Sequence, residues 1–222
     1  YLGRLTMTDT ISTDRIDPFA PWRLGSLELR NRFIKAATFE GHCPGGLPDR
    51  EGLGQFHEAF AAGGIGLCTV SYGSNEPGGR TFDDQMCLQD DILDDLKAIT
   101  ERIHRHGAKA AIQLAHCGSS SKWSGWIGRR ARGPSNGFNS LGTFVGTPFA
   151  RALKKQELTE LTQQYRSAAE RAKAAGFDAV ELHMGHGYLL SQFLSPAVNK
   201  RKDDYGGSAE NRARFPVEGL QA

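Results

Sequence analysis

Residues 181–215 read ELHMGHGYLLSQFLSPAVNKRKDDYGGSAENRARF, a loop-rich stretch directly behind a strand-like segment. That segment, 179–182, alternates small or apolar residues with a polar one, as a short buried strand does. Three chemically active side chains follow its expected end: His183, His186 and Tyr188. Gly185 and Gly187 interrupt any regular helix here and allow positive φ angles. The stretch therefore predicts that the three side chains turn toward one point.

The same stretch carries a motif of fixed spacing. It consists of His183, Met184, Gly185, His186, Gly187, Tyr188, Leu189, Leu190, Ser191, Gln192, Phe193, Leu194, Ser195 and Pro196, followed by Asn199, Arg201, Asp203, Tyr205, Gly206, Gly207, Ser208, Glu210, Asn211 and Arg212. This motif resembles the signature of the old yellow enzyme family, FMN-dependent ene-reductases and NAD(P)H:flavin oxidoreductases on a TIM barrel. A match over about fifteen positions is far more specific than a lone glycine-rich motif.

Composition points to a globular protein with one sizeable core. The 222 residues are 39% hydrophobic and 23% charged, with a net charge of +2. The small charge favours neither nucleic acid nor a membrane surface as a partner, and no stretch approaches the roughly 18 apolar residues of a spanning helix. The scattered cysteines predict reduced thiols in the cytoplasm: Cys43, Cys68, Cys87 and Cys117. Cys117, beside His116, is a candidate nucleophile of lowered pKa, with a small core residue as the favoured alternative.

The rest of the chain predicts strands and helices in alternation. Strands are expected at 32–37, after a short hairpin, and at 65–71, 108–114 and 178–182. Helices are expected at 50–62, from a cap at Asp90 or Asp91 to Gly107, and at 157–175. Residues 115–154 show no clear period and predict a long functional loop, in which Trp123 and Trp126 are interpreted as packing residues. Ser208 can cap a last helix that Pro216 would strain.

Four strand–helix units imply parallel strands, which fits either a doubly wound sheet or a barrel. A glycine-rich phosphate turn is missing after the first strand, at residues 36–41, so the barrel is favoured. With the resemblance, the fold class is an α/β TIM (β/α)8 barrel of which about the first four units are present. We expect a polar tail at 1–17, the N-terminal half of a flavin-binding barrel at 18–222, and a longer parent protein.

The active site of a TIM barrel lies at the carboxyl ends of its strands. The residues there are predicted to be Ala37, Thr38, Phe39, Tyr72, Gln113, His116, His183, His186 and Tyr188. The resemblance implies that Ala37, Thr38, Phe39, Tyr72 and Gln113 bind non-covalent FMN. It also implies that His183 and His186 bond the substrate's oxygen and that Tyr188 protonates its α-carbon. Many relatives have threonine or cysteine where this chain has Phe39, so the tuning of the flavin stays open.

The implied reaction uses NADH or NADPH to reduce the flavin and then passes hydride from flavin N5 to the activated C=C of a small enone-type substrate. The flavin-phosphate site of the family lies beyond the fourth unit, so the alternative is a non-catalytic half barrel that does not retain flavin and that can form a homo-oligomer. Zinc at His183 and His186 is disfavoured because a third ligand is missing. An aldolase is disfavoured because Lys35 and Lys109 do not stand at strand ends. Arg201, Asp203 and Glu210 are interpreted as loop-holding residues.

Overall fold

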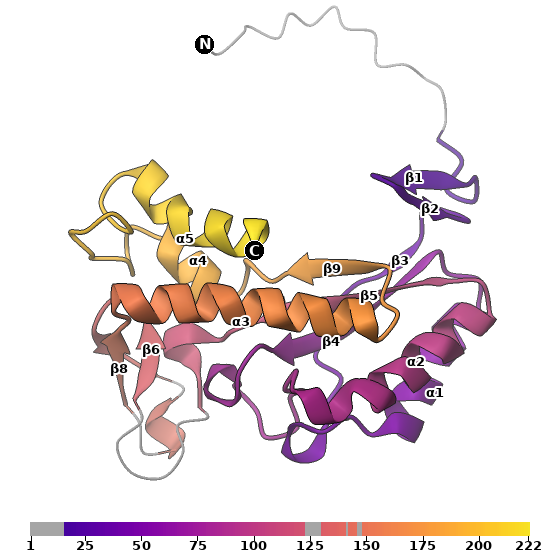
Figure 1. Ribbon diagram of the computed structural model, residues 1–222, viewed down its shortest axis with the longest axis horizontal. Coiled ribbons are helices and arrows are strands. Elements are labelled where there is room, and N and C mark those ends of the chain that lie inside the picture. The colour runs from indigo at the N-terminus through magenta and orange to yellow at the C-terminus, as the bar shows by residue number, and fades with distance from the viewer. Residues whose placement is uncertain (1–15, 123–129, 141, 146–147) are drawn as a thin grey trace, which may run out of the picture.

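The centre of the fold is a parallel four-stranded sheet (Figure 1). The computed structural model describes residues 16–122, 130–140, 142–145 and 148–222. The sheet has the order β3-β4-β5-β9, formed by β3 (Ile34–Lys35), β4 (Leu67–Ser74), β5 (Lys109–Ala115) and β9 (Ala179–Leu182). Each neighbouring pair of strands is parallel. The predicted strands are thus present, although β3 is shorter than 32–37 and β4 continues through Tyr72, which was expected to follow it.

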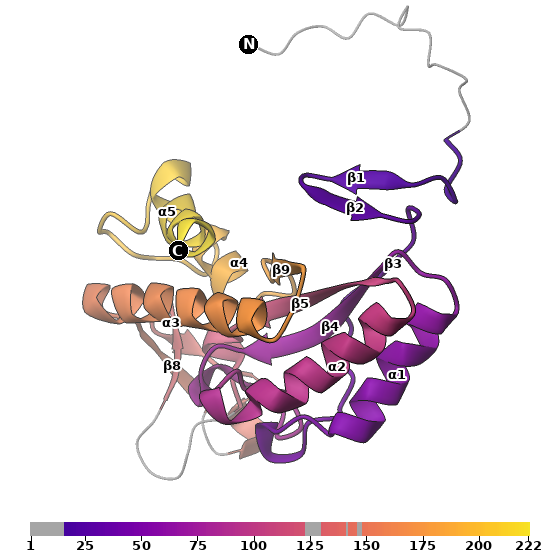
Figure 2. The same cartoon turned by 45° about the vertical axis from the view of Figure 1, so that its right-hand side comes forward.

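Three helices connect the strands and cover one face of the sheet (Figures 1 and 2). They are α1 (Arg50–Ala62), α2 (Leu93–Arg105) and α3 (Lys155–Ala174). Parallel strands require such crossovers, because a tight turn can join only antiparallel neighbours. The alternation predicted from the sequence therefore produces consecutive βα units.

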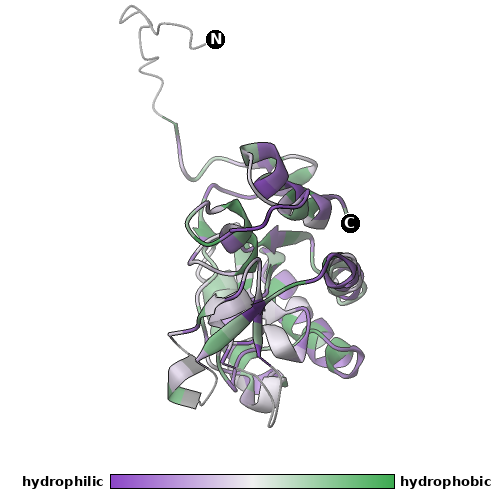
Figure 3. Cartoon of the chain, turned by 90° about the vertical axis from the view of Figure 1, so that its left-hand side faces the viewer, coloured by the Kyte–Doolittle hydropathy of each residue, from purple (hydrophilic) through white to green (hydrophobic). Residues whose placement is uncertain are grey.

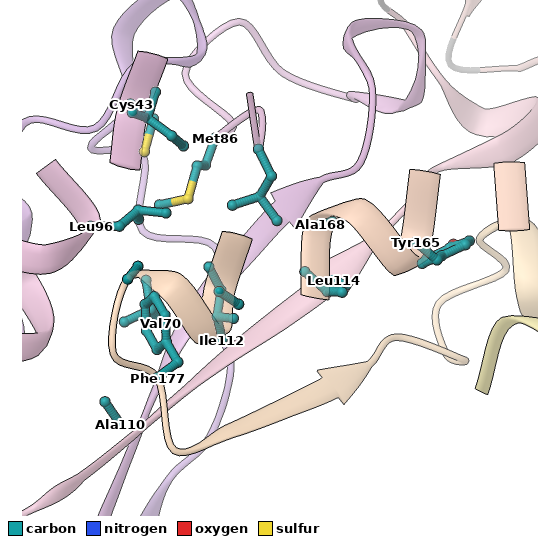
Figure 4. Packing of buried hydrophobic residues seen from close by; sticks show 14 of the residues in the cluster. Cys43, Val70, Met86, Leu96, Ala110, Ile112, Leu114, Tyr165, Ala168 and Phe177 are labelled. Atoms are coloured by element: carbon teal, nitrogen blue, oxygen red, sulfur yellow. The ribbon is translucent and has the colours of Figure 1, made fainter. Parts of the chain in front are cut away.

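The main core lies between these helices and the sheet (Figure 4). Val70, Ile112 and Leu114 project from the strands, and Leu96 of α2 and Ala168 of α3 pack in the same cluster. All five side chains are completely buried. Burial of each large aliphatic side chain contributes roughly 1.5–3 kcal/mol, so this layer fixes which face of each strand points away from the helices.

The opposite face of the sheet is covered at its amino end by a hairpin. Strands β1 (Trp22–Leu24) and β2 (Leu27–Leu29) pair in antiparallel fashion, as the sequence predicted. Leu29 packs against Leu67 of β4 and Ala111 of β5, whose side chains lie on the face opposite the helices. The edge strands keep apolar side chains exposed, with Ile34 of β3 at 43% and Val180 of β9 at 40%. The described part of the sheet is thus an open half of a barrel.

The segments at the carboxyl ends of the strands are more structured than the sequence indicated. The expected loop at 115–154 contains a second sheet of order β6-β8-β7, from β6 (Ala131–Gly133), β7 (Gly137–Phe138) and β8 (Phe149–Ala152). Trp123 and Trp126 lie outside the described residues, as does most of the expected tail. The helices α4 (Leu189–Leu194) and α5 (Ala209–Gln221) follow β9. Short 3-10 turns occupy Pro44–Gly46, Pro77–Gly79, Asp90–Ile92, Gly118–Ser120 and Gly142–Val145.

Helix caps explain which helix boundaries the sequence predicted. Helix α1 has the predicted bounds, because Asp49 accepts hydrogen bonds from the backbone N–H groups of its first turn. Ser208 caps α5 as predicted, and the helix runs on past Pro216. The predicted cap of α2 is wrong, because Asp90 and Asp91 lie inside a 3-10 turn and neither side chain caps the helix. Sequence periodicity therefore predicted the helix but not the residue at which it begins.

Hydrophilic residues dominate the outward surface of α3, which Figure 3 shows end-on. The buried stripe of this helix is narrow and consists of Leu158, Leu161, Tyr165, Ala168 and Ala172. Within the described ranges, no helix is both long enough and apolar enough to cross a membrane.

Candidate active site

A β-bulge in β4 shapes the site. The register of β4 and β5 pairs Val70 with Ile112 but Gly73 with Leu114, so Ser71 and Tyr72 together stand opposite one residue, Gln113. Val70 and Leu114 belong to the helix side. Tyr72 instead packs with Ala115, Cys117 and Tyr188, away from the helices. The extra residue therefore directs a tyrosine to the face of the sheet that would line the barrel interior.

Four side chains from two distant parts of the chain form one cluster at this end of the sheet: Tyr72 from β4, and His183, His186 and Tyr188 from the segment after β9. The hydroxyl oxygens of Tyr72 and Tyr188 are 3.0 Å apart. The His183 ring is 6.0 Å from that of Tyr72 and 5.1 Å from that of Tyr188, which it meets edge-on. The structure thus brings together the three side chains of the 181–215 stretch and adds Tyr72 through its hydroxyl.

The two histidines are hydrogen-bonded to each other, with 3.0 Å between His186 Nδ1 and His183 Nε2. His186 has a φ of 54°, a left-handed conformation that costs of order 1–3 kcal/mol outside glycine. Gly187 also has a positive φ, whereas Gly185, expected to do so, does not. The strain at His186 supports a functional role for its position.

The protonation of this pair limits what it can donate. Burial lowers the pKa of His183, and the nearby His186 lowers it further. The bond between the two rings uses an N–H of the pair. Donors of both rings therefore reach a bound oxygen only if the rings separate on binding.

Polar groups on the same interior face could hold a flat heteroaromatic ring. Gln113 is 7% exposed and donates its amide N–H to Glu181 on the neighbouring strand. The hydroxyl of Ser71 is buried and has no hydrogen-bond partner among the described residues. Ser71 and Gln113 face each other across β4 and β5, so they offer a hydroxyl and an amide at one place.

The predicted residues after β3 line the edge of this region. Ala37 is half-buried, and Thr38 and Phe39 are exposed. The Phe39 ring lies 5.9 Å from that of Tyr72 and 4.6 Å from that of Phe82. Phe39 therefore joins the aromatic cluster from the side of β3, whereas for Ala37 and Thr38 the structure establishes only their place after the strand.

Comparison with known proteins identifies the family. The model of the NADH:flavin oxidoreductase / NADH oxidase family matches residues 17–222. The chain belongs to this old yellow enzyme family. It is 40% identical over 209 residues to 4,4'-dithiodibutanoate disulfide reductase of Rhodococcus erythropolis, covering 92% of this chain and 49% of the relative. It is 38% identical over 210 residues to an NADPH dehydrogenase of Bacillus licheniformis, covering 92% and 58%. The chain thus spans about half the length of these relatives.

Solved structures of the old yellow enzyme family agree with this assignment. Morphinone reductase in complex with tetrahydroNAD superposes with a TM-score of 0.83 at 34% identity, covering 92% of this chain and 59% of the other. Old Yellow Enzyme from Pichia sp. AKU4542 gives a TM-score of 0.85 at 27% identity, covering 92% and 55%. The predicted fold class is thereby confirmed as part of a TIM barrel. The predicted cofactors, FMN with NADH or NADPH, are confirmed at the level of the family.

His116, expected at this site of the old yellow enzyme fold, has a different role. Its ring is completely buried, and Nδ1 accepts a hydrogen bond of 2.9 Å from the N–H of Gly118. Nε2, 2.9 Å from Glu76, is therefore the protonated nitrogen and donates to that carboxylate, which also binds Arg132 of β6. Burial lowers the pKa of His116 to about 4, so the ring is neutral. This network fastens the second sheet to the ends of β4 and β5.

The structure supports the favoured interpretation of Cys117, a small core residue, over a reactive thiolate. The side chain is completely buried, and this burial raises the pKa of its thiol to about 11. Cys117 packs against Tyr72 and Tyr188 as a small apolar residue. The less favoured role, a nucleophile of lowered pKa, is therefore excluded for Cys117.

All four cysteines should resist thiol reagents in the folded protein. Burial raises the pKa of Cys43 to about 12 and those of Cys68 and Cys87 to about 11, as for Cys117. The nucleophilic thiolate is therefore scarce at pH 8, and the sulfur atoms are shielded. We expect Ellman's reagent to label no thiol quickly in the native protein and four after denaturation. Rapid native labelling that Cys117→Ser removes would contradict this account of the site.

The loop after α4 is held by Arg201, as the sequence indicated. Its guanidinium donates to both carboxylate oxygens of Asp203, at 2.9 and 2.7 Å, and to the carbonyl oxygens of Pro134 and Leu153. Arg201 thereby connects this loop to the second sheet. Glu210, grouped with it in the prediction, instead lies in the first turn of α5.

Two polar residues near the aromatic cluster, Ser71 and Glu40, were missed from the sequence. Ser71 was hidden inside a run that reads as a plain buried strand, and only the pairing register of β4 reveals its bulge. Glu40 was missed because neither partner stands at a recognisable spacing. Lys35 of β3 is five residues away, which matches neither the helical nor the strand period, and the N–H of Ser71 in β4 is distant in sequence. No local pattern signals either residue.

Proposed function

We propose that this chain carries the substrate site of an FMN-dependent oxidoreductase that reduces the activated C=C bond of an α,β-unsaturated carbonyl compound at the expense of NAD(P)H. The observation that supports it best is the joint position of a phenol, Tyr188, and an imidazole pair, His183 and His186, at the carboxyl end of the sheet. This is the end at which TIM barrels carry out chemistry. The proposal assigns the roles of binding and proton transfer to these residues.

The donor set on the interior face is suited to the flavin ring. A pyrimidine edge offers both donors and acceptors, which a glutamine amide and a hydroxyl can match. Gln113 is such an amide, and the buried Ser71 hydroxyl without a partner among the described residues is such a group. Ala37, Thr38 and Phe39 would lie along the ring from β3, and Tyr72 from β4. When bound, FMN supplies the hydride-transfer chemistry that links NAD(P)H to the alkene.

His183 and His186 would bind the carbonyl oxygen of the substrate. Hydride addition at the β-carbon moves negative charge onto that oxygen, so an N–H aimed at it stabilises the transition state more than the ground state. The bond between the two rings occupies an N–H of the pair while it lasts. A substrate oxygen that separates the rings would receive a hydrogen bond from each.

Tyr188 would supply the proton to the α-carbon. Its phenol is half-buried, and burial raises its pKa, so the hydroxyl stays protonated at neutral pH. A positioned acid of this kind contributes about 10²- to 10⁴-fold to the rate. The proton leaves Tyr188 Oη as the C–H bond forms, and solvent restores it afterwards.

A disulfide is the second candidate substrate, suggested by the Rhodococcus erythropolis relative, which is named as a reductase of 4,4'-dithiodibutanoate. Hydride attack on one sulfur breaks the S–S bond and gives one thiol and one thiolate. A thiolate is a far weaker base than a carbanion, so it needs no acid in the transition state. The two substrates therefore differ in how strongly they depend on Tyr188.

Absorbance spectroscopy with added FMN tests the proposal. We expect a perturbed flavin band that bleaches when NADPH or NADH is added without oxygen and returns on addition of an enone. Gln113→Ala should weaken flavin binding, whereas Gln156→Ala, on the surface of α3, should leave it unchanged. If this chain binds no flavin, the non-catalytic half barrel becomes the better description of it. Recovery of the band with 4,4'-dithiodibutanoate but not with an enone would favour the second substrate.

A further inference from the structure

Among the described residues, the hydroxyl of Tyr72 is hydrogen-bonded to that of Tyr188 and to no backbone group. The oxygen-to-oxygen distance is 3.0 Å, and the two rings are tilted with their centroids 5.9 Å apart. Tyr72 reaches this position only through the bulge of β4, which turns it away from the helix-side core. A residue placed by such an irregularity and bonded to the candidate acid suggests a role in proton transfer.

The hydroxyls of Tyr72 and Tyr188 differ in burial and in what shifts their pKa. Tyr72 is 8% exposed, whereas Tyr188 is half-buried. Burial first, and then the bond to Tyr188, raise the pKa of Tyr72 strongly. For Tyr188, burial also raises the pKa, but the hydrogen bond from Tyr72 opposes this effect. The 3.0 Å contact allows either hydroxyl to donate, and we assign Tyr72 as the donor because it is the more deeply buried of the two phenols.

This direction has two chemical consequences. With Tyr72 donating to the Tyr188 oxygen, the Tyr188 O–H is directed away from Tyr72, toward the neighbouring Cys117 sulfur or, when substrate is bound, toward the substrate. When that proton has left, the Tyr72 hydroxyl remains directed at the phenolate. A hydrogen bond to a charged group is stronger than one to a neutral group, so the bond strengthens as the proton is transferred.

Tyr72 is not the only hydrogen-bonding neighbour of Tyr188. Thr81 also bonds it and lowers its pKa, whereas the bond with Cys117 raises it. The other groups that face the two tyrosines are the His183 and His186 rings and Asp84, whose charge acts on Tyr72. Cys117 is a neutral thiol with a pKa raised to about 11. The carboxylate of Asp84 disfavours ionisation of Tyr72, which keeps Tyr72 a donor.

We infer that Tyr72 is a positioning residue for Tyr188: its hydroxyl orients the Tyr188 proton toward the substrate and stabilises the phenolate that remains. This inference rests on the proposed function, in which Tyr188 is the acid. It goes beyond a contact of Tyr72 with the flavin, because it assigns the hydroxyl to proton transfer. The ring can still contact the flavin.

Tyr72→Phe tests the inference, since it removes one hydroxyl and keeps the ring. We expect alkene reduction to slow about 10-fold, in line with a lost hydrogen bond to a charged group. Activity requires protonated Tyr188 and disappears as pH rises through its pKa, and loss of the donor raises that pKa. The alkaline limb of the pH–rate profile should therefore move to higher pH. Reduction of the enzyme by NAD(P)H and its reoxidation by ferricyanide report any disturbance of the flavin site separately, and alkene reduction should slow more than either.

A readout without activity separates this inference from the proposed function. Nuclear magnetic resonance of protein labelled at the tyrosine ¹³Cζ follows each phenol, and Tyr188→Phe identifies the resonance of Tyr188. In Tyr72→Phe that resonance should titrate at higher pH than in the wild type. Tyr165→Phe is the matched control, because Tyr165 is buried and its hydroxyl has no hydrogen-bond partner among the described residues.

The outcomes are distinct. If Tyr188 titrates at the same or lower pH in Tyr72→Phe, with thermal unfolding unchanged, the inference is overturned and Tyr72 only packs. A fold defect would appear in thermal unfolding and would slow ferricyanide reoxidation too, and that pattern also counts against the inference. If Tyr188→Phe leaves alkene reduction intact, the assignment of Tyr188 as the acid fails, while the titration still reports whether Tyr72 donates.

Discussion

Replacement of Tyr188 by phenylalanine is expected to slow the reduction of an enone by about 10²- to 10⁴-fold, the usual contribution of a positioned general acid. The substitution keeps the ring that packs on Tyr72, Ala115 and Cys117, so the fold should be preserved. Only the proton donor is removed. The rate of reduction by NAD(P)H should be unaffected, because that step needs no proton from Tyr188.

Stopped-flow measurement of the two half-reactions checks this expectation. Tyr205→Phe is a suitable control, since Tyr205 hydrogen-bonds Glu218 of α5 and lies outside the aromatic cluster. An enone rate within twofold of the wild type in Tyr188→Phe would show that the proton comes from elsewhere. The His183 and His186 pair would then be the next group to test.

The part of the site contained in one stretch of sequence could be predicted, and the part that depends on strand register could not. His183, His186 and Tyr188 lie within six residues of each other behind β9, so glycine and strand patterns were enough to place them together. Tyr72 was assigned to a position after its strand because residues 65–71 read as a complete strand. The bulge that directs it follows from pairing with β5, which no local pattern encodes.

The fold shows the same division. Long amphipathic helices such as α1 and α3 were found because periodicity and caps are local signals. The second sheet was missed because its strands are two to four residues long, too short for any period to show. The burial of His116 was missed because its partner Glu76 and the carboxylate's second partner Arg132 come from other segments. Very short strands and non-local polar contacts therefore account for these errors.

Removal of Lys35 is expected to destabilise the protein by about 3–5 kcal/mol, because it would leave a buried charge without its partner. Lys35 lies in β3 and pairs with Glu40, and the two side chains are 6% and 2% exposed. Glu40 also accepts a hydrogen bond of 3.3 Å from the N–H of Ser71, at the bulge. The carboxylate therefore connects the loop after β3 to the bulge of β4. In Lys35→Met it would keep its charge and lose the ammonium group, and the neighbours that remain would be the Ser71 N–H and the buried His57 ring, whose Nε2 lies 3.1 Å away.

Urea denaturation of a small set of variants tests this prediction. The double variant Lys35→Met, Glu40→Gln should lose less stability than Lys35→Met alone, because a neutral amide costs less to bury than an unpaired carboxylate. Lys97→Met is the control, since its pairing with Asp94 is exposed, and we expect a change within about 0.5 kcal/mol. Equal losses in the single and double variants would mean that Lys35 acts through packing against Phe56, whose ring lies 5.2 Å from its ammonium group. Since Glu40 directly follows Thr38 and Phe39, the single variant should also weaken flavin binding if this ion pair holds the loop in place.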